Sequence, residues 1–433
     1  MKIAILGGGL TGLTLAYLMK QNGLDFDVLE KGEECGGLMK SLRTKEFTFD
    51  YGGSHIIFSK NKRVLRFMLG LLGKNKIRRR RNTKILYKGR YVKYPFENGL
   101  ADLPKEENYE CLCHFIQNLI RRERGEVEKP NNLREWCFYT FGKGIAEKYL
   151  IPYNEKIWKY PSQKIGLEWV KRIPNPPVED IIKSSLGITT EGYTHQLHFY
   201  YPRNGGIQSL IKSLEQKIEQ HIITRFEVKK IRKEDDKWII SNGKSEKVYN
   251  KIISTIPIQE LTKAVNPPKK VQDSVCNLKY NSIISVMIGL DRKRINRLSW
   301  LYVPDRKFLA HRVSFPSNFS PNVAPRTKSS LLAEITCNVG DKMWTTKDKE
   351  IINATVSDLQ QMRIINESDV CFADIRRTEF AYVINDLDYH RNMKTIRDYF
   401  RRVGIDLVGR FAEFKYLNMD DCIESALNYL HAG

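Results

Sequence analysis

Three glycines near the start of the chain have a spacing that could bind a diphosphate. Gly7, Gly9 and Gly12 follow a short apolar run, KIAIL at 2–6, and precede residues 13–22, which contain no glycine or proline. Gly7 permits a tight turn, Gly9 lets the backbone approach a pyrophosphate, and Gly12 lets a helix pack closely on a strand. The free N–H groups and the dipole at the start of that helix would hold the diphosphate.

An acidic residue completes this pattern. Residues 25–31, DFDVLEK, read as a second strand, and Glu30 lies 18 residues beyond Gly12. An acid at that place can accept hydrogen bonds from a ribose 2′-OH. The strand, turn, helix and second strand together predict a dinucleotide site at the amino-terminal end.

A histidine with potential chemistry lies in DYGGSHIIFSK, residues 50–60, where it follows two glycines. By residue type alone, His55 is either a functional group or a polar residue that packing tolerates. An unperturbed imidazole has a pKa of about 6.5, so His55 could respond to a charge change beside it. The neighbours that the fold supplies decide between the two alternatives.

The charge of the chain favours anionic ligands. Its 433 residues include 72 basic and 50 acidic side chains, a formal net charge of +22, and such a surface attracts anions. The densest basic run, KIRRRR at 76–81, is interpreted as a solvated loop before a hairpin. An anionic substrate funnel, a peripheral membrane contact and a nucleic-acid contact stay open. No nucleic-acid-binding motif accompanies the run, so no specific nucleic-acid partner is predicted.

Composition indicates a globular protein. Hydrophobic residues make up 41% and charged residues 28% of the chain. Its apolar runs are shorter than the roughly 18 residues of a membrane span, and its first residues do not resemble a signal peptide. Eight cysteines form no disulfide or zinc pattern, so we expect a reducing, cytoplasmic setting and no metal site.

Alternating and apolar runs indicate how these residues are positioned. Residues 109–150 read as mainly helical, and residues 225–257 as a strand meander that returns into the first sheet. Aromatic and β-branched runs predict a mostly antiparallel sheet; they are 197–202, 281–290, 299–304, 308–315 and 330–337. The predicted fold class is α/β, with a Rossmann-like domain interrupted by a helical plus antiparallel-sheet substrate domain.

Both domains are expected to be discontinuous. The expected dinucleotide-binding domain comprises 1–60, 198–265 and 395–433. The expected substrate domain comprises 61–197 and 266–394, with its helical part at about 99–192 and its sheet part at about 280–380.

A second glycine pair identifies the dinucleotide by resemblance. Gly36 and Gly37 follow Glu30 after six residues, and this acid-then-glycines pattern resembles the flavoprotein superfamily of amine oxidases, protoporphyrinogen oxidase and UDP-galactopyranose mutase. The resemblance implies FAD as cofactor. The residues expected to hold it are Gly7, Gly9, Leu10, Thr11, Gly12, Glu30, Lys31, Gly36, Gly37, Leu38, Gly53, Ser54 and, in the meander over the adenine, Val228.

Separate segments further resemble UDP-galactopyranose mutase, especially its eukaryotic type. Their order along the chain is that of the family, and together they cover most of its length. They are GGSHIIFS (52–59), YVKYPFENGLADLPKEE (91–107), FGKGIAEKYLIPYNEKIWKYP (141–161), FYYPRNGGIQSL (199–210), WLYVP (300–304), HRVSFPSNFSP (311–321) and GRFAEFKYLNMDD (409–421).

The resemblance implies roles for residues at matching positions. Arg172 and Arg312 would clamp a substrate diphosphate through charge-assisted hydrogen bonds. Arg312 lies in an otherwise apolar strand, where a buried guanidinium needs an anionic partner. His55 would tune the reduced flavin. The other expected residues are Asn154 and Trp158 at the uridine, Tyr302, Tyr382 and Tyr416 at the phosphates and sugar, and Arg410, Asn418, Met419 and Asp420 beside the flavin.

The implied reaction is a pyranose–furanose interconversion of a UDP-sugar, in which N5 of reduced FAD attacks the anomeric carbon. NAD(P)H is left open as the reductant. One alternative is an FAD-dependent oxidoreductase of the amine oxidase or protoporphyrinogen oxidase type, which predicts an apolar tunnel rather than two converging arginines. Another is a binding protein on the same scaffold, as in the GDP-dissociation inhibitors.

Overall fold

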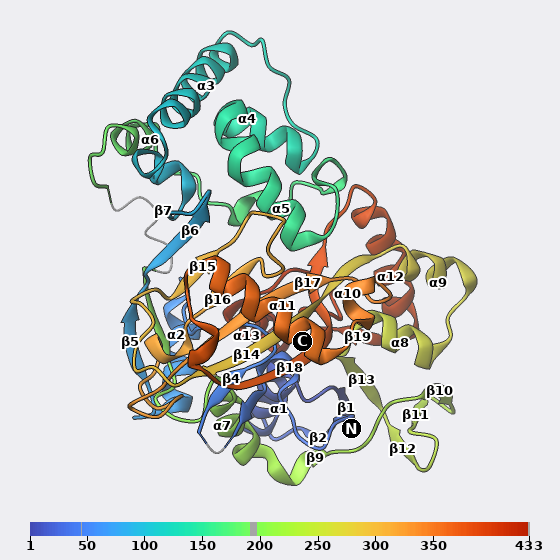
Figure 1. Cartoon of the computed structure of the whole chain (residues 1–433). Helices are drawn as coiled ribbons and strands as arrows, with labels where there is room; N and C mark the ends of the chain where they lie inside the picture. Colours follow the sequence, from blue (N-terminus) through green and yellow to red (C-terminus); the bar gives the residue numbers. More distant parts are fainter. Residues whose placement is uncertain (45, 191–196, 432–433) are drawn as a thin grey trace.

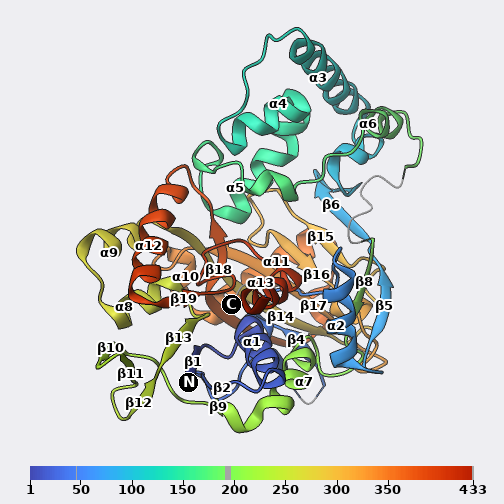
Figure 2. The same cartoon turned by 180° about the vertical axis from the view of Figure 1, so that it is seen from behind.

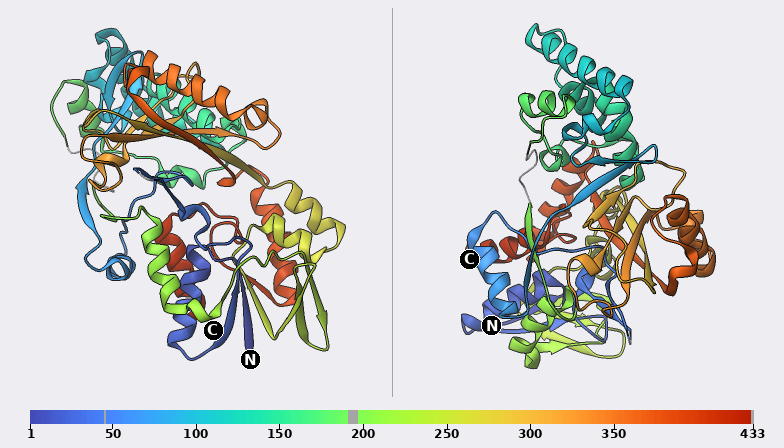
Figure 3. Two further views of the ribbon diagram at one scale, coloured as in Figure 1. Left: turned by 60° about the horizontal axis from the view of Figure 1, so that its bottom comes forward. Right: turned by 60° about the vertical axis from the view of Figure 1, so that its left-hand side comes forward.

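The computed structural model describes residues 1–44, 46–190 and 197–431. A parallel sheet lies at one end of the molecule, a larger sheet crosses the middle, and a group of helices that includes α3 and α4 forms the other end (Figure 1). Further views show the same order of parts (Figure 3). The predicted combination of an α/β domain with a helical and antiparallel-sheet part is confirmed.

The amino-terminal strand lies at the centre of a five-stranded parallel sheet. Its four last residues are buried, as expected for a strand that is covered on both faces. In spatial order the strands are β19 (Ile405–Leu407), β13 (Lys251–Ser254), β1 (Lys2–Leu6), β2 (Asp25–Leu29) and β9 (Ile222–Ile223). With α1 (Leu10–Gln21) between β1 and β2, the predicted strand–turn–helix–strand unit is confirmed.

Different elements cover the two faces of this sheet. One face shares a core with the helices seen together from behind (Figure 2), which are α1, α2 (Lys62–Leu72), α7 (Gln208–Ile218) and α13 (Met419–His431). The other face packs against the meander and three more helices, α8 (Ile258–Val265), α9 (Lys269–Cys276) and α12 (Tyr389–Val403). Because α1 follows β1 after a short turn, its beginning lies at the carboxyl edge of β1.

The meander consists of three antiparallel strands, and β13 then returns into the parallel sheet as predicted. The strands are β10 (Lys230–Glu234), β11 (Lys237–Ser241) and β12 (Glu246–Tyr249). Residues 225–229, predicted as part of the first strand, precede it. The backbone N–H groups of Arg225 and Phe226 instead donate to the carbonyls of Gly32 and Glu30, which ties this segment to the loop after β2.

The large sheet has seven strands, mostly antiparallel. In spatial order they are β18 (Val370–Ile384), β14 (Lys279–Leu290), β17 (Ser329–Cys337), β16 (Arg312–Ser314), β15 (Trp300–Tyr302), β6 (Thr83–Tyr87) and β7 (Arg90–Lys93). The predicted strand 308–315 is shorter, since only Arg312–Ser314 pairs in the ladder. Register places Arg312 opposite both Tyr302 and Glu334, so one face of the sheet gathers these three side chains.

The helical part of the molecule contains a helix whose start is fixed by hydrogen bonds between residues close in sequence. Its elements are α3 (Lys105–Glu123), α4 (Leu133–Ile145), a π-helical turn η4 (Ala146–Leu150), α5 (Ile151–Trp158) and α6 (Val178–Ser185). Asn132 caps α4, because its Oδ1 accepts from the N–H of Glu135 at 3.0 Å while its amide donates to the Glu135 carboxylate at 2.8 Å. The cap satisfies one backbone donor that the start of a helix leaves unpaired.

The basic run at 76–81 is not the solvated loop that we expected. Ile77–Arg80 forms β5, which pairs with β8 (His198–Tyr201), and Arg81 lines the large cavity described below. Alternating side chains of a strand point to opposite faces, so a run of arginines need not face water throughout. Across the described parts of the chain, no helix has the length and apolar character of a membrane span.

Candidate functional site

A cavity of about 1900 Å³ extends from the carboxyl edge of the parallel sheet to the large sheet and α5. Single-ligand pockets commonly have volumes of roughly 300–1,000 Å³, so this cavity can hold a dinucleotide and a second ligand together. Gly12 and Trp158 are the predicted site residues that do not line it. Those that do are Gly7, Gly9, Leu10, Thr11, Glu30, Lys31, Gly36, Gly37, Leu38, Gly53, Ser54, His55, Asn154, Arg172, Val228, Tyr302, Arg312, Tyr382, Arg410, Tyr416, Asn418, Met419 and Asp420.

The glycines at the start of α1 form a cradle that fits a diphosphate. Gly9 is the N-cap of α1, and a Cβ added to it would meet no protein atom within 4 Å. A Cβ on Gly12 would instead lie 2.0 Å from the carbonyl oxygen of Gly7, which has a φ of +98°. Gly12 therefore serves the close packing of the helix on the turn, whereas Gly9 leaves open space in front of the helix N–H groups.

The carboxylate of Glu30 is fixed at the end of β2. Its two oxygens accept the backbone N–H groups of Gly8 and Gly32, each at 2.8 Å. Glu30 is 9% exposed and lines the cavity. Each carboxylate oxygen can accept a further hydrogen bond, so the residue fits a ribose hydroxyl. The cradle and this acid together fit the adenosine diphosphate half of a dinucleotide.

The anionic partner of Arg312 is a protein residue. Its Nε and Nη2 donate to the two oxygens of Glu334 at 2.5 and 2.7 Å, and Glu334 is fully buried. The same carboxylate accepts the N–H of Ser54 and the hydroxyl of Ser314, each at 3.2 Å. We expected a substrate phosphate to balance Arg312, and that expectation was incomplete. Nη1 makes no hydrogen bond within the described residues and remains available to a ligand.

The pKa of Glu334 reflects this pairing. Burial acts to raise the pKa of the carboxyl, but the charge and hydrogen bonds of Arg312 outweigh burial and hold the pKa below its ordinary value. The pKa of Arg312 is held well above its ordinary value, since Glu334 outweighs the opposing effect of burial. Both groups are therefore charged at neutral pH, and one wall of the cavity carries a fixed guanidinium.

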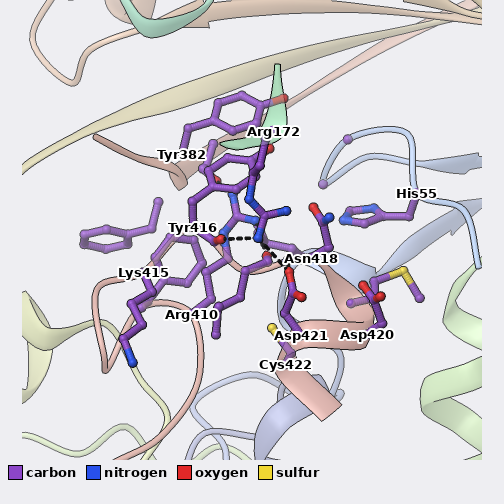
Figure 4. A pocket seen from close by; sticks show the side chains of 18 of the residues that line it. His55, Arg172, Tyr382, Arg410, Lys415, Tyr416, Asn418, Asp420, Asp421 and Cys422 are labelled. Atoms are coloured by element: carbon purple, nitrogen blue, oxygen red, sulfur yellow. Dashed lines mark hydrogen bonds and ion pairs between the residues drawn. The ribbon is translucent and has the colours of Figure 1, made fainter. Parts of the chain in front are cut away.

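Arg172 is held by Tyr416 and by the first turn of α13. Its Nη2 donates to Asp421 at 2.7 Å and to the carbonyl of Tyr416 at 2.8 Å, and its guanidinium lies 5.2 Å from the ring centroid of Tyr416 (Figure 4). Asp421 also accepts the backbone N–H of Asn418 at 2.8 Å. Arg172 and Arg312 thus line one cavity, each with a carboxylate partner and with N–H groups to spare.

Arg410 joins an aromatic group on the same side of the cavity. Its Nη1 and Nη2 donate to the carbonyls of Leu417 and Ala381 at 2.6 and 2.7 Å. Its guanidinium lies 4.4 Å from the ring centroid of Tyr416, which is stacked on Tyr382 with centroids 6.1 Å apart and planes at 6°. Its Nε is buried without a partner in the described residues. The rings and the cation form a positively charged wall.

His55 lies across from this wall, beside Asn418 (Figure 4). Its Nδ1 is buried with no partner within the described residues. Burial and the charge of Arg410 lower the pKa of His55 to about 4, although a backbone hydrogen bond at Gly53 acts in the opposite direction. This value lies below the unperturbed pKa of about 6.5 for an imidazole. The imidazole is neutral at physiological pH and can act as a hydrogen-bonding group.

Asn154 lines the cavity, whereas Trp158 lies behind its wall and not in the position that we expected. The indole N–H groups of Trp158 and Trp169 both donate to Oδ1 of Asn154, at 3.1 and 3.0 Å, and the Asn154 amide donates to Leu150 at 2.8 Å. Trp158 is 2% exposed and does not line the cavity. It supports the wall rather than contacting a ligand directly, and Asn154 holds two indoles in place.

The carboxyl-terminal helix brings acids to the cavity. Met419 begins α13, and Asp420 lines the cavity one residue later. Burial and the charge of Asp421 raise the pKa of Asp420.

Within the described residues, no cluster of three or more His, Cys, Asp or Glu side chains could hold a metal ion.

Sequence reasoning missed Glu334 and Arg81. The signal for Glu334 was a lone acid in the apolar run SLLAEITC, which fits a lone arginine on a neighbouring strand. Arg81 donates from Nε to Thr83 at 3.0 Å and from Nη2 to the hydroxyl of Tyr302 at 3.1 Å, and it lies 4.8 Å from the ring centroid of Tyr94. The sequence alone does not distinguish Arg81 from the other basic residues at 76–81, because its place at the cavity depends on how the strands fold.

Comparisons with known proteins agree with this geometry. Residues 10–428 match the model of the family described as flavin containing amine oxidoreductase. The chain belongs to this family. The family implies a flavin cofactor, FAD, and the chain is a flavoenzyme. This membership disfavours the binding-protein alternative.

Curated relatives match short parts of this flavoprotein. Probable flavin-containing monoamine oxidase A of Dictyostelium discoideum is 28% identical over 117 residues, 27% of this chain and 25% of the relative. A 4,4'-diapophytoene desaturase (4,4'-diaponeurosporene-forming) of Staphylococcus aureus (strain COL) is 42% identical over 52 residues, 12% of this chain and 10% of the relative. The matches thus span a quarter or less of these relatives.

Solved structures match the whole chain. Reduced UDP-galactopyranose mutase has a TM-score of 0.90 at 24% identity, over 100% of this chain and 96% of that chain. Putrescine oxidase bound to putrescine has a TM-score of 0.69 at 13% identity, over 100% and 99%. At these identities the similarity shows the fold alone.

Proposed function

We propose that the protein is an FAD-dependent enzyme that binds a nucleotide sugar, a UDP-sugar, and interconverts its pyranose and furanose forms. The observation that carries the proposal is that Arg172 and Arg312 both line the cavity that also contains the dinucleotide cradle. Reduced flavin supplies the nucleophile for the anomeric carbon when it is bound. The protein then has to hold a diphosphate leaving group close to the sugar, and a pair of guanidiniums suits that task.

The N–H groups of Arg172 and Arg312 that have no protein partner are the donors available to a diphosphate. Nη1 of Arg312 and both Nε and Nη1 of Arg172 have no hydrogen bonds within the described residues, while their other nitrogens are anchored to Glu334 and Asp421. Anchored donors keep their geometry when the ligand arrives, so little ordering is needed on binding. They also offset the charge that develops on a departing diphosphate.

The groups on the remaining walls agree with this chemistry. Tyr382 is 9% exposed and Tyr302 is held by its hydrogen bond from Arg81, so both hydroxyls are positioned at the cavity. His55, neutral because its pKa is about 4, can exchange a hydrogen bond without carrying a charge. A reaction whose bond changes take place on the flavin needs few acid–base groups from the protein.

Amine oxidation is the second candidate. The parallel rings of Tyr382 and Tyr416 would suit an amine held over an aromatic face, and the family model itself favours it. However, Arg410 lies against the Tyr416 ring and Arg172 is 5.2 Å from its centroid. A cationic amine would meet like charges there, which favours an anionic substrate.

Binding of UDP to the FAD-loaded protein tests the proposal. Arg172→Ala removes charge-assisted hydrogen bonds worth about 1.5–3 kcal/mol each, so we expect UDP affinity measured by calorimetry to fall at least tenfold. Arg232 is a matched control, since it pairs with Glu234 and Glu246 on the meander and does not line the cavity. Unchanged UDP affinity in Arg172→Ala, or an equal loss in Arg232→Ala, would reject the clamp.

A further inference from the structure

A second pocket, with a volume of about 490 Å³, lies beside the basic strand β5 and shares no lining residue with the large cavity. Its walls are Arg79 of β5, the loop 291–299 between β14 and β15, the turn η8 (Pro316–Asn318) and the beginning of β17. Pockets for one small ligand commonly have volumes of roughly 300–1,000 Å³. The size of this second pocket therefore suits a small molecule.

Cationic side chains dominate the lining of the second pocket. Of its ten lining residues none is acidic, and the four cationic ones are Arg79, Lys293, Arg294 and Arg297. Basic residues make up 72 of the 433 residues of the chain, so the pocket holds more than twice its share of them. None of the four forms an ion pair within the described residues, whereas the neighbouring Arg292 lies 3.8 Å from Asp369. The repulsion among these cations is therefore left for a ligand to offset.

The loop that carries three of these cations has an anchored backbone. At its start, the buried hydroxyl of Ser329 donates to the carbonyl of Arg292 at 2.5 Å. At its end, the amide of Asn82 donates to the carbonyl of Arg297 at 2.9 Å. An anion therefore meets donors on a backbone that is already in place, and little loop ordering is needed on binding.

Arg79 brings a partly buried cation to the opposite wall. Its Nε donates to the carbonyl of Phe319 at 3.0 Å, and its two Nη groups make no hydrogen bond within the described residues. Burial and the charge of Arg203 lower the pKa of Arg79, but a guanidinium stays protonated in proteins. The anchored Nε leaves a planar pair of donors to face an anion.

Two serine hydroxyls lie at the same pocket. Oγ of Ser317 accepts the backbone N–H of the buried Ser330 at 2.7 Å, and the two hydroxyl oxygens are 2.9 Å apart. One hydroxyl donates to the other, so one O–H has no acceptor within the described residues. The pocket thus adds a neutral donor to its four cations.

We propose that this second pocket binds a small ligand that carries two or more phosphate groups. A guanidinium makes paired, charge-assisted hydrogen bonds to phosphate oxygens, and linked phosphates place several negative charges within one small space. The concave shape favours a small ligand over a duplex or a flat membrane. The basic run at 76–81 then contributes to two sites, Arg81 to the large cavity and Arg79 to this pocket. This inference does not depend on the proposed function.

Calorimetric titration of the FAD-loaded protein with tripolyphosphate tests the inference, with UDP present so that the diphosphate clamp is occupied. The triple variant Lys293→Ala/Arg294→Ala/Arg297→Ala changes exposed side chains only, so it should fold normally and bind tripolyphosphate at least tenfold more weakly. Arg79→Gln should also weaken binding. If Arg79→Gln does not fold, the triple variant decides.

A matched control removes the same charge elsewhere. Lys129, Lys230 and Lys244 are exposed and line neither pocket, so their triple alanine variant should bind tripolyphosphate within twofold of wild type at about 0.1 M ionic strength, where charges more than about 10 Å apart are largely screened. An equal loss in this control, equal affinity of wild type and the pocket variant, or no binding by wild type would overturn the inference.

Two further arms identify where the phosphates come from. Binding to vesicles of phosphatidylcholine and phosphatidic acid that tripolyphosphate displaces would support the site with a lipid headgroup as its ligand. Tripolyphosphate binding without vesicle binding would support it with a free phosphorylated compound. Binding of duplex DNA, lost in the pocket variant and without any binding of tripolyphosphate, would assign the surface to nucleic acid and overturn the inference.

Discussion

The most informative perturbation of the cavity wall is substitution of the buried pair Arg312 and Glu334. Glu334 is fully buried and receives two of its four hydrogen bonds from Arg312. Arg312→Ala leaves a buried carboxylate with two neutral donors, and removal of one partner from a buried ion pair costs about 3–5 kcal/mol. The double variant Arg312→Ala/Glu334→Ala removes both charges, so its cost should fall short of the sum of the single variants by more than about 1 kcal/mol.

Urea unfolding followed by tryptophan fluorescence measures this coupling. All four proteins are compared at one saturating FAD concentration, because a bound ligand adds to apparent stability. The exposed pair Arg232 and Glu246, with hydrogen bonds of 2.6 and 2.9 Å, gives the control cycle, and we expect no measurable coupling there. Additivity of Arg312→Ala and Glu334→Ala within about 0.5 kcal/mol would refute the reasoning.

The same pair sets a pH dependence of stability. The folded-state pKa of Glu334 is lower than its ordinary value because of Arg312, so the unfolded chain binds the proton more tightly. The contribution of the pair is then complete above an unfolded pKa of about 4.3 and is lost as the pH falls through the lower folded value. The acid limb of the stability profile should therefore flatten in the double variant.

Three other predictions concern the cradle, the imidazole and the clamp. Gly9→Ala should fold normally, since its Cβ meets no protein atom within 4 Å, but it should bind FAD more weakly because the Cβ fills the space of the cradle. Gly12→Ala should lower the melting temperature of the apoprotein, because its Cβ would lie 2.0 Å from the carbonyl oxygen of Gly7. Equal melting temperatures of the Gly9→Ala and Gly12→Ala apoproteins would contradict this. The imidazole of His55 should titrate by NMR with a midpoint near 4, and a midpoint above 6 would contradict its burial. Asp421→Asn should strengthen UDP binding at low salt, because it removes a negative charge beside Arg172 while the carbonyl of Tyr416 still anchors the guanidinium; the gain should vanish in the Arg172→Ala background.

The glycine cradle at the start of α1 could be predicted from the sequence because its signals are local. Gly7, Gly9 and Glu30 lie within one strand–helix–strand unit, and the backbone demands of a diphosphate fall on the glycines themselves. The order of strands around β1 follows from the same unit. Gly12 also behaves as its spacing predicts, since it packs the helix on the turn.

The properties of the substrate side depend on distant residues and could not be predicted in the same way. Arg312 meets Glu334 only through the register of two antiparallel strands. The pKa of His55 is set by burial and by Arg410, which lies 355 positions away in sequence (410 minus 55). Trp158 turns into the core because Asn154 accepts its indole N–H. Residue type and spacing carry none of this information.

Turnover by the reduced holoprotein tests the central claim most directly. The FAD-loaded protein is reduced with dithionite under anaerobic conditions and incubated separately with UDP-galactopyranose and UDP-galactofuranose. We predict that each is converted into the other, that the oxidised protein converts neither, and that the flavin stays reduced throughout. Absence of interconversion in the reduced protein, together with reduction of the oxidised flavin by an amine, would contradict the claim.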